Sequence, residues 1–306
     1  MKHVTIGIIT YKRPLWLKRL LLELMKQKAQ GFSFSILVVD NANDAETQQV
    51  VRSFSQNNIE ISYFVESNRG IVSARNRVVS ECLKTDAHYL AFIDDDEWPE
   101  NDLWLQRLFV VAENENVDIV TSHVISVNEE MSKNWATEIL YPKNTLTERE
   151  RVKVFYTNNV LLSTSMLSKM SPCFDERFAM TGASDYHFSL KCQLAGYECV
   201  YAHSPVLEEL PNSRANLKWF CRRGFRSGIG YTRAHLFEEA FLKVVVKCFI
   251  LSGVRFIRGT ALIIQSLVIR NKSCLANGLF RLCSSVGTLA GFLGIKHQEY
   301  KYTHGK

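Results

Sequence analysis

Residues 89–97 have the sequence YLAFIDDDE, in which an apolar run ends in four consecutive acids. The run predicts a buried strand with the acids at its carboxyl end. Neighbouring carboxylates repel one another and are costly to desolvate, so a cation or a set of donors must offset that cost. Carboxylates without His or Cys among them favour a hard ion, Mg²⁺ or Mn²⁺. A solvated acidic turn that caps the next helix would have the same sequence, but strand-end placement and charge density favour the metal site.

The segments on both sides of this stretch repeat the order of strand and helix. The repeats indicate an α/β fold with a largely parallel sheet that is covered on both faces. Ligands of such sheets bind at the carboxyl ends of the strands, so we expect the site there. The predicted strands are 4–9, 35–40, 59–65, 89–94 and 118–121, and the predicted helices are 14–28, 45–57, 71–84 and 101–116.

Beyond residue 122 the periodicity weakens, and the composition changes again after Pro211. We predict one catalytic domain over 1–210, with a nucleotide-sugar-binding part at about 1–122 and an acceptor part at about 123–210. A basic helical region over 211–306 follows it. The elements predicted beyond residue 122 are strands at 134–141, 159–163 and 198–202, and helices at 184–195, 241–269 and 274–295.

The charge of the chain is divided unevenly. Residues 211–306 carry 16 Lys and Arg against 3 acids, a net +13, whereas residues 1–210 carry 21 against 28, a net −7, which together give the +6 of the chain. Such a split indicates an anionic partner, either membrane lipid or nucleic acid. Charges interrupt the apolar runs before the ~18 residues of a spanning helix, which favours amphipathic helices in the membrane interface. A helical cap packed on the catalytic domain remains the alternative.

The cysteines and the first residues bear on the compartment. The eight cysteines show no CxxC and no paired ligand spacing, so we expect reduced thiols, as in a cytoplasmic protein. Residues 1–9 run directly into a strand pattern, and we expect no secretory signal there.

Four further strand ends and loops carry candidate site residues. ITYKRP ends the first strand, where a ring beside polar groups suits a nucleotide, although a strand-to-helix turn explains it equally. Asp40 follows the second strand and suits a base, a ribose or the cap of the next helix. In NRGIVSARN, Gly70 supports a turn into a helix whose N-terminus favours anions, and Arg75 lies near enough to reach one. In GASDYHF, Asp185 suits a general base or an ordinary N-cap.

In this order and spacing, ITYKRP, VVDNAND, NRGIVSARN, FIDDDE and TGASDYHFSLK resemble the family 2 glycosyltransferases of GT-A fold. The resemblance covers residues 1 to about 235. The later run EELPNSRANLKWFCRRGFRSG is similar to the branch that builds bacterial exopolysaccharides of the succinoglycan type.

The resemblance implies a role for each matching position. Asp94 and Asp96 match the outer carboxylates of the family's DxD motif, with Asp96 the direct metal ligand and Asp94 closer to the ribose. Asp185 matches the catalytic base, but Ser184 stands where the family usually has an acid. The other nucleotide-sugar-binding residues that the resemblance implies are Thr10, Tyr11, Arg13, Asp40, Arg75 and Asp95.

The resemblance implies an inverting transferase that uses Mn²⁺ or Mg²⁺ and a nucleoside-diphosphate sugar in bacterial surface polysaccharide synthesis. Its acceptor would be a glycan or a polyprenyl-diphosphate-linked sugar at the inner face of the plasma membrane, with an anionic membrane surface as partner. We expect no nucleic-acid partner. The alternative is a nucleic-acid- or anionic-surface-binding protein with a non-catalytic α/β domain, which would explain the basic tail but not the DDDE strand end.

Overall fold

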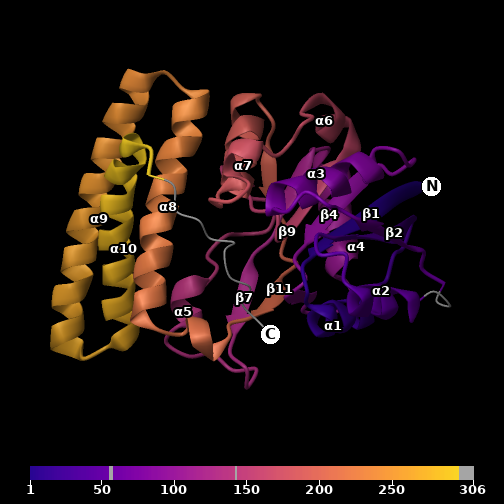
Figure 1. Cartoon of the computed structure of the whole chain (residues 1–306), viewed down its shortest axis with the longest axis horizontal. Coiled ribbons are helices and arrows are strands. Elements are labelled where there is room, and N and C mark those ends of the chain that lie inside the picture. The colour runs from indigo at the N-terminus through magenta and orange to yellow at the C-terminus, as the bar shows by residue number, and fades with distance from the viewer. Residues whose placement is uncertain (55–57, 142, 296–306) are drawn as a thin grey trace.

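The structure, a computed structural model, describes residues 1–54, 58–141 and 143–295. Figure 1 shows two parts side by side, a layered α/β part and a helical region. The main sheet has the strand order β3-β2-β1-β4-β9-β6-β10-β8. Its strands are β1 (Lys2–Thr10), β2 (Phe32–Asp40), β3 (Ile61–Val65), β4 (Tyr89–Ile93), β6 (Ile119–Thr121), β8 (Arg151–Val152), β9 (Asn159–Ser163) and β10 (Cys199–Tyr201).

The predicted α/β fold is confirmed, and the sheet is parallel from β3 to β4 and mixed beyond it. In the register, Thr10 pairs with Asp40 and Gly7 with Phe92. The ends of β1, β2 and β4 therefore reach the same edge, where the acids that follow β4 emerge beside Thr10. Gly7 permits this close packing, because a Cβ there would clash with Val78 of the covering helix.

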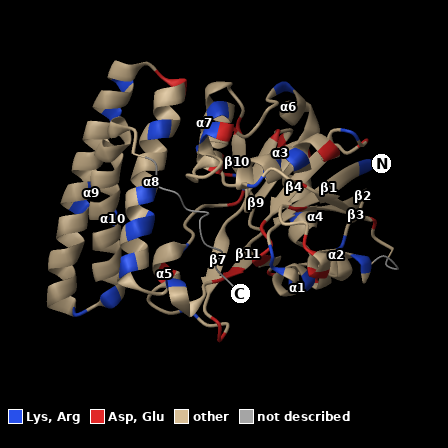
Figure 2. Cartoon of the chain, viewed as in Figure 1, with Lys and Arg blue, Asp and Glu red and all other residues tan. Residues whose placement is uncertain are grey.

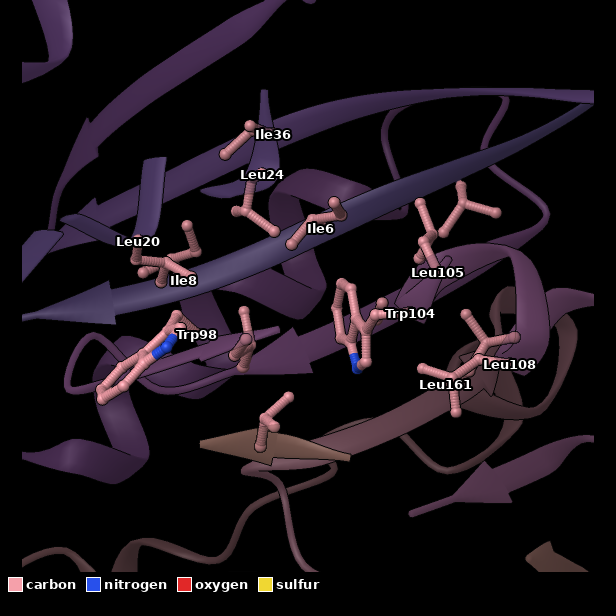
Figure 3. Close-up of a cluster of buried hydrophobic side chains, with 14 of the residues drawn as sticks. Ile6, Ile8, Leu20, Leu24, Ile36, Trp98, Trp104, Leu105, Leu108 and Leu161 are labelled. Atoms are coloured by element: carbon pink, nitrogen blue, oxygen red, sulfur yellow. The ribbon is translucent and has the colours of Figure 1, made fainter. Parts of the chain in front are cut away.

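Helices cover both faces of the sheet. One buried cluster joins the sheet to α1 (Pro14–Leu24), α2 (Ala45–Arg52) and α4 (Trp104–Glu115), and Figure 3 shows its centre around Trp104 and Ile6. The Trp104 indole also donates a hydrogen bond to Asn159 Oδ1 at 3.0 Å, which ties α4 to β9. The second cluster lies under α3 (Ile71–Cys82), α6 (Thr164–Lys169) and α7 (Ser184–Leu194).

A small sheet extends the α/β part beside the acids. It consists of β5 (Glu97–Pro99), β11 (Val206–Glu209) and β7 (Val124–Val127), and the sequence analysis missed all three strands. The strand predicted over 134–141 is wrong, because α5 (Thr137–Leu140) forms there. Asn134 Oδ1 accepts the backbone N–H groups of Ala136 and Thr137, which starts a helical turn.

The helical region consists of α8 (Leu217–Glu238), α9 (Phe241–Ile269) and α10 (Lys272–Ala290). α10 packs against both other helices, and α8 faces the α/β part (Figure 1). Small residues bring the backbones together: a Cβ on Gly224 or Gly228 of α8 would clash with carbonyl oxygens of α10. Short 3₁₀ turns at Glu176–Phe178, Asn212–Arg214 and Gly291–Leu293 complete the described elements. No helix of the described residues is long and apolar enough to cross a membrane.

Candidate active site

A cavity of about 740 Å³ lies between the α/β part and the helical region. The residues that follow β1 and β4 line it, together with the first turns of α3 and α7, and α8 and α9 close it from the opposite side. It contains eight of the nine residues that the sequence analysis proposed for the site: Thr10, Tyr11, Arg13, Arg75, Asp94, Asp95, Asp96 and Asp185.

The acids after β4 are held by two residues at the end of β1 and just beyond it, Thr10 and Arg13. Thr10 Oγ1 donates to Asp95 Oδ2 at 2.8 Å, and Arg13 Nη1 donates to Asp95 Oδ1 at 2.9 Å and to Asp96 Oδ2 at 3.3 Å. Arg13 also lies over the ring of Trp16. In this structure Arg13 therefore neutralises the acids, a contact that the sequence analysis does not predict.

The charge on the acids is only partly compensated. Burial raises the pKa of Asp94 to about 7, against the opposing charge of Arg75, and burial likewise raises that of Asp95 to about 6. Burial and the neighbouring Asp94 and Glu208 raise the pKa of Glu97 well above its usual value. Each shift means that the site favours additional positive charge.

The donor set fits a hard divalent ion. Asp94 and Asp96 offer carboxylate oxygens at the cavity, and repulsion from neighbouring acids favours a bound cation. Among residues 1–54, 58–141 and 143–295, no group of three or more His, Cys, Asp or Glu side chains is arranged to hold an ion. Mg²⁺ commonly needs only one or two carboxylates, with substrate phosphates and water completing its shell.

Arg75 and Asp185 meet on the other side of the acids. Arg75 is buried, and its Nη1 donates to Ser184 Oγ at 2.9 Å while its buried Nε lacks a hydrogen-bond partner. Ser184 stands where the resemblance implies an acid, so Arg75 has a neutral hydrogen-bond acceptor there and Asp94 as a charged neighbour. Asp185 lies in the first turn of α7, after Ala183 with φ 67°, and its Oδ1 accepts the N–H of Tyr186 at 2.8 Å.

Asp40 does not line the cavity, and the structure assigns its carboxylate to the turn after β2. It is fully buried and accepts hydrogen bonds from the N–H groups of Ala42 and Asp44 and from the Tyr63 hydroxyl. The neighbouring Asn41 lines the cavity instead, and its side chain binds the Glu66–Gly70 loop through three hydrogen bonds. That Asp40 contacts the nucleoside therefore stays a prediction, and Asn41 is the residue of this turn that lines the cavity.

The opposite wall carries residues that sequence reasoning did not place in the site. Arg214, Arg223, Arg226 and Arg255 line it, together with Tyr231. Figure 2 shows basic residues along α8, and Arg255 reaches the cavity from α9. The spacing of the glycines in α8 predicts close packing against another helix. This spacing could have shown from the sequence that α8 has a defined inner face. Glu208 also lines the cavity, whereas Glu209 pairs with Arg19.

Comparison with known proteins assigns a family. The family model described as "Glycosyl transferase family 2" matches residues 5–171. Over 303 residues the chain is 25% identical to "Succinoglycan biosynthesis protein ExoM" of Rhizobium meliloti (strain 1021), covering 97% of this chain and 95% of that protein.

Two solved structures share the fold. The mannosyltransferase PcManGT from Pyrobaculum calidifontis, in complex with GDP-Man and Mn²⁺, superposes with a TM-score of 0.63 at 13% identity, covering 95% of this chain and 87% of that one. S. aureus TarS 1-349, in complex with UDP-GlcNAc, gives a TM-score of 0.54 at 14% identity, covering 99% and 94%.

Proposed function

Because the chain belongs to glycosyl transferase family 2, we propose that it transfers a sugar from a nucleoside-diphosphate sugar to a hydroxyl of a glycan or lipid-linked acceptor, with inversion. The observation that carries this proposal is the cavity in which Asp94 and Asp96, Arg75 and Asp185 meet. Acids that favour a cation, a buried arginine and an accessible carboxylate are the groups that such a transfer requires. The name of the ExoM relative supports a role in polysaccharide synthesis.

Each group has a defined task in the proposed reaction. Asp185 accepts the proton of the acceptor hydroxyl as its oxygen attacks the anomeric carbon, and the nucleoside diphosphate leaves from the opposite face. Arg75 lies beside Asp94 and Ser184, where its charge stabilises the leaving diphosphate. When bound, Mn²⁺ or Mg²⁺ would be held by Asp94 and Asp96 and would neutralise charge on the diphosphate. Tyr11 and Asn41 line the end of the cavity where we expect the nucleoside.

A donor panel tests this proposal. Purified protein is incubated with UDP-, GDP- and dTDP-sugars and Mn²⁺ or Mg²⁺, and release of nucleoside diphosphate is measured. We expect metal-dependent release from one donor, its loss in Asp96→Ala, and its retention in Glu100→Ala, which removes an exposed acid beyond the cluster. A folded wild-type protein that neither hydrolyses nor binds any donor with metal would contradict the transferase function and favour the binding-protein alternative.

The composition of the helical region supports association with the inner face of the plasma membrane. Large apolar side chains recur along the outer face of α9 at spacings of three, four or seven residues. They are 41–77% exposed and comprise Leu242, Val246, Ile250, Val254, Ile257, Ile264 and Leu267. Small residues such as Ser252 and Gly259 face the other helices. A helix in water has the opposite distribution, with polar side chains outside and large apolar ones inside. The arrangement in α9 therefore suits an apolar surrounding. Basic residues interrupt the outer face, and they favour an anionic bilayer.

Vesicle flotation tests the membrane association. We expect the wild type to float with vesicles of phosphatidylcholine and phosphatidylglycerol, and a Phe249→Gln/Ile257→Gln variant to remain unbound. Leu15→Gln is the matched control, because Leu15 is 78% exposed but lies on α1. Equal flotation of the double variant and the wild type would contradict membrane docking through α9.

A further inference from the structure

Three hydrogen-bonded side chains connect the cavity to the helical region. The first is Tyr186, which follows Asp185 in the first turn of α7 and lines the cavity. Its hydroxyl oxygen lies 3.0 Å from Nε2 of His235, a buried residue of α8. His235 Nδ1 is in turn hydrogen-bonded to the carboxylate of Glu239, the residue that follows α8. We call Tyr186, His235 and Glu239 the tyrosine network.

The end of the tyrosine network that lies away from the cavity carries a negative charge. Glu239 forms ion pairs with Lys243 Nζ at 2.8 Å and with Lys247 Nζ at 2.9 Å, both on α9. Burial alone would raise the pKa of Glu239, but its hydrogen bonds with the two lysines and with His235 lower it to about 2. Glu239 is therefore an ionised carboxylate, which can only accept hydrogen bonds.

The charge of Glu239 fixes the direction of each hydrogen bond in the network. Because the carboxylate can only accept, His235 must carry a proton on Nδ1 and donate it to Glu239. Burial lowers the pKa of His235, which favours the neutral ring, and Nε2 of that ring has no proton. Burial also raises the pKa of Tyr186, so its hydroxyl keeps its proton and donates it to Nε2. The Tyr186 oxygen is then left with a lone pair that can accept a hydrogen bond from a ligand.

The surroundings of Tyr186 leave this lone pair available. Among residues 1–54, 58–141 and 143–295, the Tyr186 hydroxyl has no hydrogen-bond partner other than His235. The ring of Tyr231 lies against both side chains, with centroid distances of 5.6 Å to Tyr186 and 4.4 Å to His235, and this packing restricts their movement. Asp185 and Tyr186 are consecutive and both line the cavity. We therefore expect an acceptor that reaches Asp185 to lie beside Tyr186 as well.

We propose that Tyr186 orients the acceptor by accepting a hydrogen bond from one of its hydroxyl groups, and that His235 and Glu239 hold Tyr186 in this role. This inference rests on the proposed function and adds an acceptor-binding residue to it. In a sugar acceptor the bound group is a hydroxyl next to the attacking one, because the attacking hydroxyl gives its only hydrogen to Asp185. Water has two hydrogens, and it can donate one to Asp185 and the other to Tyr186.

Nitrogen NMR of the full chain with isotope-labelled histidine tests the direction of the hydrogen bonds without requiring turnover. The resonances of His235 are identified by their loss in His235→Gln and, with the histidine in place, by the shift of its Nε2 resonance in Tyr186→Phe. At neutral pH we expect a neutral His235 ring with its proton on Nδ1. A proton on Nε2, in either the neutral or the doubly protonated ring, would overturn the proposal, because Tyr186 would then have to accept from His235.

Metal-dependent hydrolysis of the donor, with water as the acceptor, tests the role of Tyr186 in the site. We expect Tyr186→Phe to lower kcat about three- to tenfold, the effect of one neutral hydrogen bond, with the KM of the donor unchanged. Tyr197→Phe is the matched control, because Tyr197 lies beyond the end of α7 and does not line the cavity, and it should keep the wild-type kcat.

A wild-type kcat in Tyr186→Phe would overturn the proposal even if His235 carries its proton on Nδ1. A wild-type protein that hydrolyses no donor would instead contradict the transferase function, while the NMR measurement would still report the state of His235. A failure of the tyrosine network is thus distinguishable from a failure of the proposed function.

Discussion

The contact between Arg13 and the acids after β4 makes a quantitative prediction. Arg13 Nη1 lies 2.9 Å from Asp95 and 3.3 Å from Asp96, and the Arg13 and Asp95 side chains are only 17% and 6% exposed. Arg13→Met keeps the apolar stem and removes the charge. Asp95 retains its hydrogen bond from Thr10 but loses its cation. Removing one partner of a buried ion pair costs about 3–5 kcal/mol, and removing one partner of an exposed pair costs less than about 1 kcal/mol. For this largely buried pair we expect the free energy of unfolding to fall by about 2–4 kcal/mol.

Urea unfolding in EDTA measures this loss, since bound metal would mask it. A cycle with Asp95→Asn isolates the pair, and we expect a coupling energy of about 1–3 kcal/mol. Arg52→Met, an exposed arginine on α2, should change the unfolding free energy by less than about 0.5 kcal/mol. A similarly small loss in Arg13→Met, or additive single and double variants, would refute the assignment of Arg13 to charge neutralisation.

Three further predictions concern the base, the helical packing and pH. Asp185→Asn should lower the single-turnover transfer rate about 10²–10⁴-fold with donor affinity retained, and an unchanged rate would exclude Asp185 as the base. Gly228→Ala should lower the thermal midpoint, because its Cβ would clash with Ser284, whereas Gly253→Ala, with open space around it, should not. Burial lowers the pKa of His123 to about 4, so the unfolded chain binds its proton first and stability falls as pH drops from about 6.5 to about 4. Chemical denaturation should show a flatter pH profile for His123→Gln than for the wild type.

The sequence predicts the first half of the fold well because its signals are local. Strands such as 89–94 are short apolar runs, and the helices between them repeat every three or four residues. The three-residue β5 is too short to show alternation, and its pairing with Leu207 comes from far along the chain. Over 134–141 the sequence has a strand-like pattern, but the side chain of Asn134 accepts the Ala136 N–H and a helical turn forms there instead.

The site follows the same division between local and distant contacts. The acids after β4 can be recognised in the sequence because four of them are consecutive. The register of β1 and β4 brings Thr10 to them. The role of Asp40 depends on Tyr63, which lies on the neighbouring strand and offers no signal in the local sequence. Arg223 and Arg255 belong to a basic tail in the sequence, and only the packing of α8 and α9 on the α/β part turns them toward the cavity.

The two walls of the cavity have separate origins in the chain. One is made chiefly by residues that end the early strands, up to Asp96, and the other largely by residues beyond 210. Exchanging the segment beyond residue 210 for that of a relative would therefore replace one wall and keep the residues at the strand ends. Substitutions beyond residue 210 can therefore change the second wall while the residues of the first wall stay the same. Chimeras joined near Pro211 would be the natural starting point for altering what this enzyme accepts.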